Sequence, residues 1–469
     1  MSYGNECIKR LYNYAPNPFK TFITSSYGML QRYQRYGKIY NRQINFLMES
    51  QYWSNEELSA YQHKRINQFL EDIYNKIPFY KKNPLYDNLD QEHSDIKLYP
   101  ILLKQLVKQN ISEFYNRNIN KIIWGHTSGT TGSAMTFPIS KKAYQKEYAF
   151  RYLHYSWGGV NLHNREKIAI CAGHPVTASD RKKPPFWSFD AVNNHLLFSS
   201  YHLSEVNLRY YIKKLEDFNP LLLHGYPSSI YLLALAYKKY GKKKLNLKSV
   251  FTSSETLLYT QRNRIEDAFQ VKVFNWYGTS EMSANIVECE KGELHLKAEH
   301  SFVEIVNDNN QLCKPGETGR IISTNFNNTA FPLIRYDIGD IVKISKNQIP
   351  KCGRGGLLVD HIEGRIEDYI VTPDGRIIGR LDHLFKDSAN VIEAQIEQPK
   401  IEEIILRIVR GSHYSKEDEK LIYNEAKSRL GSSIKISFDY VENIIRTKNG
   451  KFRFIISKIN PSDSYLKLK

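Results

Sequence analysis

A short run of hydroxyl and glycine residues is the part of this chain with the clearest capacity for chemistry. It follows the apolar residues 122–124 and consists of Thr127, Ser128, Gly129, Thr130, Thr131 and Gly132. Two glycines let a backbone approach an anion closely, and the hydroxyls and free N–H groups of such a loop can surround phosphate oxygens. The next residue is Ser133, so the Lys-Ser/Thr pair of a Walker A loop is absent. Alone, such a hexapeptide is more often a surface turn.

Further candidate residues stand in separate stretches later in the chain. They are Ser253, Ser254 and Glu255, then Tyr277, Gly278, Thr279 and Glu281 within residues 275–281, then Asp340, Arg365 and Lys451. Each has an ordinary interpretation by itself, as a core aromatic residue, a solvated carboxylate or a loop lysine. Their significance lies in the set and in its order along the chain.

In this order the motifs resemble those of the adenylate-forming (ANL) superfamily, which includes acyl-CoA synthetases, standalone adenylation enzymes and luciferases. The resemblance spans roughly residues 120–455. It implies that Tyr277 stacks on adenine, that Thr279 contacts the α-phosphate and that Glu281 holds magnesium. It also implies a phosphate loop at 127–132, an adenine-side segment at 253–255 and a ribose-binding carboxylate at Asp340. Gly364 and Arg365 would open the hinge motif, with Glu367 as the hinge. Lys451 would be the lysine that reaches the α-phosphate.

These residue types also suit the reaction on physical grounds. Attack of a carboxylate on the α-phosphorus of ATP brings two anions together, so the site needs a divalent cation, N–H donors and a lysine to offset the charge. Glu281, the loop at 127–132 and Lys451 supply these three roles. We therefore expect Lys451, Glu281 and Thr279 to be the catalytic residues.

Within the superfamily, residues 198–204, 223–229 and 391–398 resemble the phenylacetate-CoA ligase-like group and its CapK-type branch of capsular and surface polysaccharide biosynthesis. The resemblance places His224, Gly225 and Tyr226 beside the acyl pocket. His174 and the run 181–183 lie between the phosphate loop and that pocket, with aromatic residues close by, and such groups suit a polar acid, for example a uronic or amino acid, better than a fatty chain. The alternative is that the run 181–183 is a solvated loop.

The chain departs from the family pattern at three points. No lysine follows the phosphate loop within three residues, and Glu367 stands where the hinge residue is commonly Asp. Many members of the group carry a zinc site, and its matching residues here are Cys289, His295 and Cys352, with Pro350 in place of one cysteine. Structural zinc takes four protein ligands. Unless Cys313 or a water supplies the fourth, the set is incomplete, and the sequence favours no zinc.

The elements that must position these residues fall into three parts. Residues 1–120 are predicted to be mostly helical, as the N-terminal part of a large domain. Residues 121–366 alternate short apolar strands with helices and then become strand-rich, which predicts an adenylate-forming α/β core with mixed sheets, flanking helices and a β-rich subdomain. Residues 367–469 predict a small, mobile α+β lid domain, with a helix at 416–430 between two strands.

Composition sets further limits on the class of protein. The 469 residues carry a formal charge of +17 but only short basic clusters and no nucleic-acid-binding signature, so no nucleic-acid partner is expected, and weak peripheral contact with an anionic membrane stays open. No apolar run reaches the length of a membrane span, and no signal-peptide core is present, so we expect a cytoplasmic protein. The five cysteines contain no C-x-x-C pair and are expected to be free.

These observations lead to one main hypothesis and two alternatives. The first is a ligase that uses ATP, Mg²⁺ and a small carboxylic acid to make an acyl-adenylate. A small-domain rotation about Glu367 then exposes that intermediate to an amine or thiol acceptor, such as CoA, a sugar nucleotide or a lipid-linked glycan. The second is a nucleotidyltransferase that moves AMP onto a small-molecule hydroxyl. The third is a binding protein with a relic site, which the presence of Glu281, Asp340 and Lys451 argues against.

Overall fold

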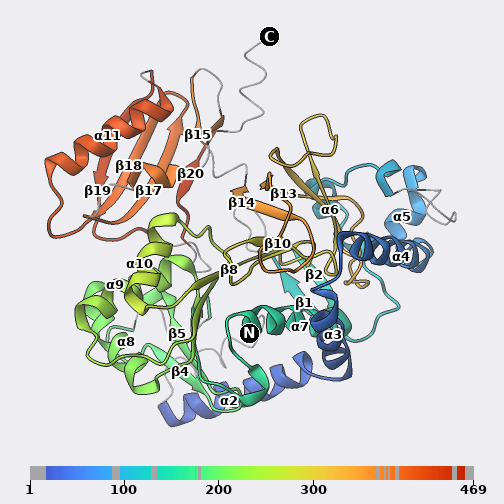
Figure 1. Ribbon diagram of the computed structural model, residues 1–469, viewed down its shortest axis with the longest axis horizontal. Coiled ribbons are helices and arrows are strands. Elements are labelled where there is room, and N and C mark those ends of the chain that lie inside the picture. Colours follow the sequence, from blue (N-terminus) through green and yellow to red (C-terminus); the bar gives the residue numbers. More distant parts are fainter. Residues whose placement is uncertain are drawn as a thin grey trace.

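The computed structural model describes residues 17–86, 96–127, 135–174, 176–177, 181–365, 370–373, 377–378, 381–385, 390–431, 433–445 and 452–459. Most of these residues surround one sheet of twelve strands, and the end of the chain forms a smaller unit beside it (Figure 1). The predicted α/β class, with a large sheet flanked by helices and a small C-terminal α+β unit, is confirmed.

The large sheet is continuous from its strand-rich end to its α/β end. In spatial order its strands are β11 (Phe302–Val306), β12 (Thr318–Thr324), β13 (Tyr336–Ile344), β14 (Leu358–Arg365), β10 (Leu294–Leu296), β9 (Asn285–Glu288), β8 (Val273–Gly278), β7 (Ser249–Ser253), β6 (Leu222–Gly225), β3 (Ile168–Ala172), β5 (His195–Ser199) and β4 (Trp187–Asp190). Strands β5, β3, β6, β7 and β8 run parallel, and the other neighbours pair antiparallel. The carboxyl ends of the parallel strands therefore meet at one edge, where ligands bind in open α/β sheets.

Helices cover both faces of the parallel strands. On one face, α8 (Glu205–Phe218), α9 (Pro227–Tyr240) and α10 (Tyr259–Phe269) enclose a core that includes Cys171, Phe198 and Ile230, all fully buried. On the other face lies α7 (Lys141–Trp157), which begins at Ser140, whose side chain accepts a hydrogen bond from the amide of Ala143. This cap satisfies one of the orphan donors at the helix start.

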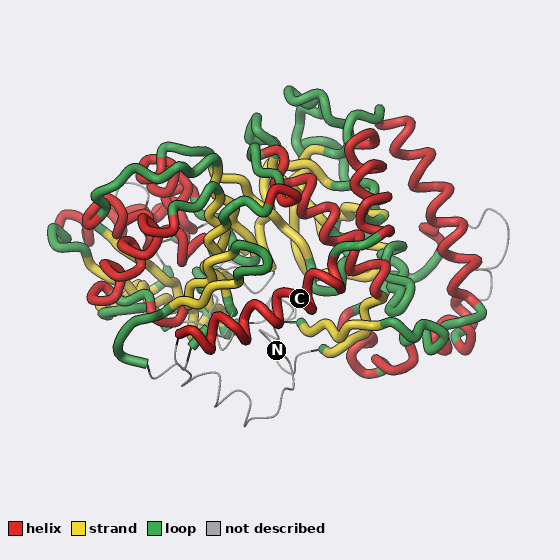
Figure 2. The backbone as a smooth tube through the Cα atoms, turned by 90° about the horizontal axis from the view of Figure 1, so that it is seen from below, coloured by secondary structure: helices red, strands yellow, loops and turns green. Residues whose placement is uncertain are grey.

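The N-terminal region is helical, as its apolar spacing predicts. Its helices are α2 (Asn17–Arg35), α3 (Lys38–Ser50), α4 (Asn55–Tyr74), α5 (Pro78–Lys82) and α6 (Lys104–Gln109). Helix α2 runs along the underside of the molecule (Figures 1 and 2), where Lys20 donates to the hydroxyl of Thr177 and Thr24 shares a hydrogen bond with Ser188 of β4. The region is thus packed onto the α/β core.

A two-stranded hairpin precedes the main sheet. Strand β1 (Ile122–His126) pairs with β2 (Thr136–Ser140), and the two strands bracket the glycine- and hydroxyl-rich loop. The amide of Thr127 donates to the carbonyl of Met135, and the Thr127 hydroxyl accepts from the amide of Met135 at 2.9 Å. These bonds close the base of the loop.

The C-terminal unit has its own sheet and core. Strands β19 (Lys435–Tyr440), β18 (Glu403–Arg410), β17 (Val391–Lys400) and β20 (Ile455–Ser457) pack against α11 (Lys416–Leu430), whose bounds match the predicted helix, and a short pair joins β15 (Ile370–Val371) to β16 (Ile377–Ile378). Ser415 and Asp418 form a reciprocal cap at the start of α11. Ile396, Leu406 and Ile422 belong to the core of this unit.

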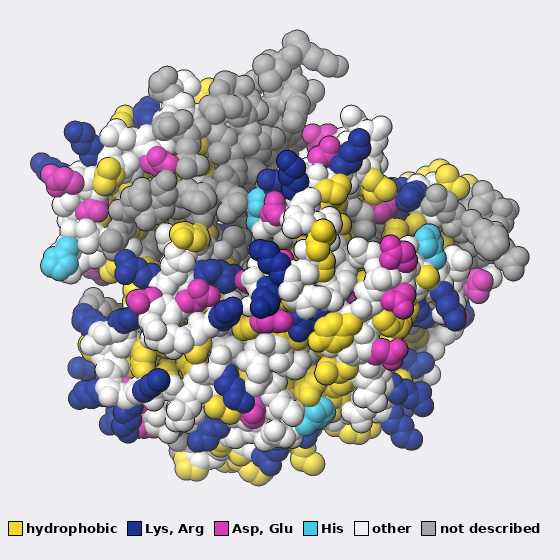
Figure 3. All heavy atoms as spheres, viewed as in Figure 1, with side chains coloured by type: hydrophobic (Ala, Val, Ile, Leu, Met, Phe, Trp, Pro, Cys, Tyr) yellow, Lys and Arg dark blue, Asp and Glu magenta, His cyan; other side chains and the backbone are white. Residues whose placement is uncertain are grey.

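Charges of both signs are mixed on the side of the molecule drawn in Figure 3. On the side seen in Figure 3, Lys and Arg side chains are scattered among acidic and apolar ones. Within the part of the chain that the structure describes, no helix combines the length and the apolar character that crossing a bilayer requires.

Candidate active site

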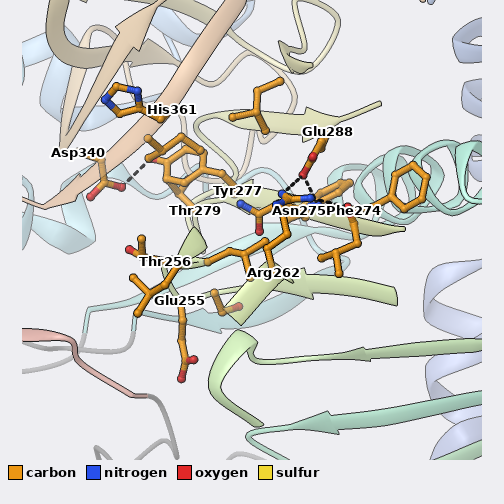
Figure 4. A pocket seen from close by; sticks show the side chains of 18 of the residues that line it. Glu255, Thr256, Arg262, Phe274, Asn275, Tyr277, Thr279, Glu288, Asp340 and His361 are labelled. Atoms are coloured by element: carbon orange, nitrogen blue, oxygen red, sulfur yellow. Dashed lines mark hydrogen bonds and ion pairs between the residues drawn. The ribbon is translucent and has the colours of Figure 1, made fainter. Parts of the chain in front are cut away.

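A cleft of about 750 Å³ lies where the large sheet meets the C-terminal unit. Its lining comes from segments far apart in the sequence, including Lys104, Thr127, Ser254, Glu255, Tyr277, Gly278, Thr279, Glu281, Asp340, His361 and Phe452. Figure 4 shows Tyr277 and Asp340 facing each other across this cleft, with the Tyr277 hydroxyl donating to the Asp340 carboxylate at 2.6 Å. The structure thus brings together most of the predicted nucleotide residues that lie in its described part.

The turn after β8 carries the predicted Tyr-Gly-Thr-Ser-Glu residues. The Thr279 hydroxyl accepts a hydrogen bond from the amide of Ser283 at 2.9 Å, which holds the turn and fixes the threonine side chain. Glu281 is buried, and the Tyr336 hydroxyl donates to it at 3.3 Å. A carboxylate in such a place needs compensation by hydrogen bonds and opposite charge.

Part of that compensation comes from Lys104, which sequence reasoning missed. Its Nζ lies 3.7 Å from the Glu281 carboxylate, and both residues line the cleft. Lys104 is the first residue of α6, about 180 positions before Glu281, and no motif marks it. It places a cation in the cleft in addition to those that the sequence indicated.

Glu255 connects the large sheet to the C-terminal unit. One of its carboxylate oxygens accepts from the amide of Ser228 at 3.1 Å, and the other accepts from the amide of Phe452 at 2.5 Å. Its neighbour Ser254 has a φ of 71°, in the left-handed region where glycine is unstrained. That conformation explains why the superfamily, which the segment resembles, has glycine beside this glutamate.

Several predicted residues fall outside the described part of the chain or only partly inside it. Residues 128–132, Glu367 and Lys451 lie outside it, and for Arg365 only the backbone is described, paired with Asp340 in the sheet. Phe452, the residue after Lys451, lines the cleft.

The far end of the cleft contains a polar group that the sequence did not indicate. Arg262 donates to Glu288 at 2.7 Å, and the amide of Asn275 donates to the same carboxylate oxygen at 2.9 Å (Figure 4). Burial raises the pKa of Glu288, and Arg262 acts against that shift. The group ties α10 to strands β8 and β9.

The predicted acyl-side residues lie at the carboxyl ends of β3 and β6. His224 is hydrogen-bonded to the Tyr155 hydroxyl at 2.6 Å and to the Ser253 hydroxyl at 3.1 Å. A side chain at Gly225 would place its Cβ 2.1 Å from the carbonyl oxygen of Cys171, so this position requires glycine. Tyr226 is buried at the start of α9, and His174 follows β3 with its side chain exposed.

A cluster with the chemistry of a metal site borders the cleft. Cys289, Glu293, His295 and Cys352 each offer one ligand atom, and the four atoms lie within 4.8 Å of one another. The Cys352 sulfur is 3.3 Å from His295 Nε2, and burial lowers the pKa of His295 to about 4. Two thiols, an imidazole and a carboxylate suit tetrahedral zinc.

Glu293 is the ligand that the sequence analysis lacked. Its place in the cluster corrects the suggestion that Cys313 could be the fourth ligand, because Cys313 lies elsewhere, donating to the carbonyl of Thr318. The signal was weak, since a carboxylate four residues after a cysteine is common in any exposed turn.

Comparisons with known proteins agree with this geometry. The family model for the CapK C-terminal domain matches residues 370–458. Protein CapK of Staphylococcus aureus is 30% identical over 465 residues, which cover 96% of this chain and 100% of that protein. The chain belongs to the CapK family.

The chain also resembles proteins more distant than CapK. The phenylacetate-coenzyme A ligase of Thermus thermophilus is 23% identical over 276 residues, or 52% of this chain and 61% of the ligase. Among solved structures, 2-hydroxyisobutyryl-CoA ligase in the postadenylation state, in complex with 2-HIB-AMP, has a TM-score of 0.66 at 18% identity and covers 88% of this chain and 92% of its own. The resemblance of this CapK-family chain to the adenylate-forming superfamily and its phenylacetate-CoA ligase-like branch is confirmed.

Proposed function

We propose that this CapK-family protein is an ATP-dependent ligase that activates a carboxylic acid as an acyl-adenylate. The observation that supports it most directly is the hydrogen bond from the amide of Phe452 to Glu255. It brings the chain next to Lys451 into the cleft that holds Tyr277, Thr279 and Glu281. A single site thus combines an aromatic platform, a ribose-type carboxylate and the means to deliver a lysine.

Each residue has a defined task in this proposal. Tyr277 stacks on the adenine, and Asp340, now held by the Tyr277 hydroxyl, accepts the ribose hydroxyls. Thr279 and Lys451 donate to the α-phosphate, where negative charge builds up as the carboxylate attacks and pyrophosphate leaves. Lys104 lies beside Glu281 and supports the phosphates in place of the lysine that the loop at 127–132 lacks.

Magnesium fits the site through Glu281. Its carboxylate is buried, lines the cleft and has the oxygen chemistry that Mg²⁺ prefers. When bound, the ion would neutralise part of the phosphate charge. Lys104, with its Nζ 3.7 Å from the same carboxylate, helps to orient it in the folded protein.

The second half-reaction transfers the acyl group to an amine or a thiol. The 2-hydroxyisobutyryl-CoA ligase found by the structural comparison is described with CoA as well as with 2-HIB-AMP, which supports CoA as one acceptor. Membership of the CapK family favours a sugar nucleotide or a lipid-linked glycan, in capsular or surface polysaccharide biosynthesis. Rotation of the C-terminal unit about Glu367 would withdraw Lys451 between the two steps.

The cluster of Cys289, Glu293, His295 and Cys352 is proposed to hold a structural zinc. Its four protein ligands leave no open position, which distinguishes it from a catalytic zinc site. The cluster joins the β9–β10 turn to the segment that carries Cys352. Metal binding there would brace one wall of the cleft.

Acid-dependent exchange between pyrophosphate and ATP tests the proposed function. We expect exchange with some members of a panel of aromatic, amino, uronic and short-chain acids, and none without an acid. AMP transfer to a hydroxyl compound without any carboxylate would instead show a nucleotidyltransferase. A protein that binds no ATP would contradict both activities and leave the relic-site alternative.

A further inference from the structure

The face of the large sheet under α7 and α2 is less tightly packed than the opposite face. On β3, β5 and β6, the side chains of one face remain partly accessible to solvent, namely those of Ile170, Ala172, His195, Leu197 and His224. The parallel register places these residues on the same face, because side chains alternate along each strand. Solvent therefore reaches between the sheet and the two helices, beside the predicted acyl-side residues.

Helix α7 presents a polar stripe to this region. Tyr144, Tyr148, Arg151 and Tyr155 follow one another at spacings of four, three and four residues, which places them on one side of the helix. The bond from Tyr155 to His224 shows that this side faces the sheet. Arg35, the last residue of α2, arrives over the same stripe, with its Cζ 4.4 Å from the centroid of the Tyr148 ring, while that of Arg151 lies 5.0 Å away.

The acidic groups around the two arginines are few: Glu147 lies near Arg151, which lowers the pKa of that carboxyl, and both arginines lower the pKa of Tyr148. Among the described residues no ion pair joins Arg35 or Arg151 to a carboxylate, and the nearby Glu147 pairs instead with His300 at 2.9 Å. The Nε of Arg35 is buried and has no hydrogen-bond partner. Two half-buried guanidinium groups that share one tyrosine ring and form no ion pair with a carboxylate among the described residues leave a place for an anion.

Three histidines face the same positive charges. Burial lowers the pKa of His174 to about 4, with Arg35 and Arg151 adding to the shift. Burial also lowers the pKa of His195 to about 3, and the charge of Arg35 is the second cause. It lowers the pKa of His224 to about 3 as well, and there the charge of Arg151 is the second cause. His174 is exposed at its surface and yet crowded enough by neighbouring groups for burial to lower its pKa. The histidines are therefore neutral, and the arginines alone supply positive charge.

We infer that this region, which we call the arginine–histidine site (Arg35, Tyr148, Arg151, His174, His195 and His224), binds a substrate acid that carries a second anionic group. The inference rests on the proposed function and names its substrate class. The reacting carboxylate lies near Ser253, which is bonded to His224 and precedes the cleft residue Ser254. The second group, a carboxylate or a phosphate, is held by Arg35 and Arg151.

The spacing of residues along α7 predicts the distance between the two anionic groups of this acid. Arg151 is one turn of α7 before Tyr155, and Tyr148 is two turns before it, so the rise of the helix separates them by about 6 and about 10 Å. The second anionic group should therefore lie about 6 to 10 Å from the reacting carboxylate. The neutral imidazoles of His174 and His195 suit hydroxyl groups on the body of the acid, since a neutral imidazole has one donor and one acceptor nitrogen. Both nitrogens of His224 are already bonded to Tyr155 and Ser253.

Pyrophosphate exchange with matched acids tests the inference. Adipate is compared with its monomethyl ester, and 6-phosphogluconate with gluconate, so each pair differs in the second charge and the two pairs separate carboxylate from phosphate. In at least one pair we expect kcat/KM to be at least about 10-fold higher for the charged acid. Arg35→Gln and Arg151→Gln should each lower kcat/KM for the charged acid about 10- to 100-fold. For the uncharged acid of the same pair, kcat/KM should stay within about threefold of the wild-type value.

Controls separate recognition from folding. Arg209→Gln removes an exposed arginine that stacks on Tyr210 outside this region. This variant should leave kcat/KM unchanged for both the charged and the uncharged acid. Arg151→Lys keeps a charge, and calorimetric ATP binding reports on folding. Equal losses for charged and uncharged acids, or a preference for uncharged acids in both pairs, would overturn the inference while the proposed function stands. Absence of exchange with every acid would overturn both.

Discussion

The nucleotide cleft and the arginine–histidine site are neighbours, yet they are built in different ways. The cleft takes its residues from short contiguous motifs, such as 253–255 and 277–281, at the ends of β7 and β8. The arginine–histidine site takes single side chains from α2, α7 and strands β3, β5 and β6. In the proposed function, the chemistry of adenylation is thus assigned to residues in local backbone turns, whereas the proposed specificity depends on isolated residues that only packing brings together.

The two sites also differ in how their charges are balanced. In the cleft, Glu281 has Lys104 and Tyr336 as partners, and Glu255 binds two backbone amides. In the arginine–histidine site, Arg35 and Arg151 stack on Tyr148 and form no ion pair with a carboxylate among the described residues. A site whose charges are already paired can orient a substrate in a fixed geometry. In our proposal, a site whose cations form no ion pair with a carboxylate takes its balancing charge from the substrate.

The largest effect is expected from Lys451→Ala. Loss of a donor to the α-phosphate should reduce acid-dependent pyrophosphate exchange about 100- to 1,000-fold or more, with Tm unchanged. Lys458→Ala, which removes an exposed partner of Glu397 in the same unit, is the matched control. Near-normal pyrophosphate exchange in Lys451→Ala would contradict the proposal that Lys451 acts on the α-phosphate in this cleft.

A smaller effect is expected from Lys104→Met. Removing the cation beside Glu281 should lower kcat/KM for ATP about 10- to 100-fold, because the phosphates and the buried carboxylate both lose a partner. Lys108→Met, one turn later on α6, should leave it unchanged. If the two variants behave alike in steady-state kinetics, Lys104 has no role in the cleft.

The metal cluster should affect stability more than recognition. Cys352→Ser is expected to abolish retention of zinc, measured by elemental analysis, and to lower Tm by about 3 to 4 °C, since a ligand present at 100 times its Kd contributes about 2.7 kcal/mol and the unfolding entropy of so long a chain is large. Cys313→Ser, outside the cluster, serves as the control. Wild-type protein purified without metal and insensitive to added zinc would refute the proposed site.

The smallest effect concerns pH and the arginine–histidine site. Guanidinium groups stay charged throughout, and the pKa values of His174, His195 and His224 lie at about 4 or below, so these imidazoles stay neutral above about pH 6. KM for the preferred dianionic acid should therefore vary less than about threefold between pH 6 and 8.5. A rise of 10-fold or more as pH passes about 6.5 would show that a histidine supplies the charge instead.

Helices and turns that are specified by neighbouring residues could be predicted from the sequence alone. The helix at 416–430 is bounded by Ser415, whose side chain caps the first turn, and by Gly431 after its last residue. The turn at 277–281 follows a buried strand, and its residue types match one family in order. In both cases the residues that matter are neighbours in the chain, so spacing alone describes their geometry.

Only the tertiary structure decided which distant residues meet. Lys104 reaches Glu281 because Leu102, just before α6, pairs with Tyr336 of β13, whose hydroxyl also contacts Glu281. Glu293 meets Cys352 because β14, which follows Cys352, lies beside β10. Arg35 and Arg151 share the ring of Tyr148 because α2 ends over the middle of α7. Such contacts depend on how elements far apart in the sequence pack together. The spacing of residues along one helix or strand does not specify which other element will pack against it.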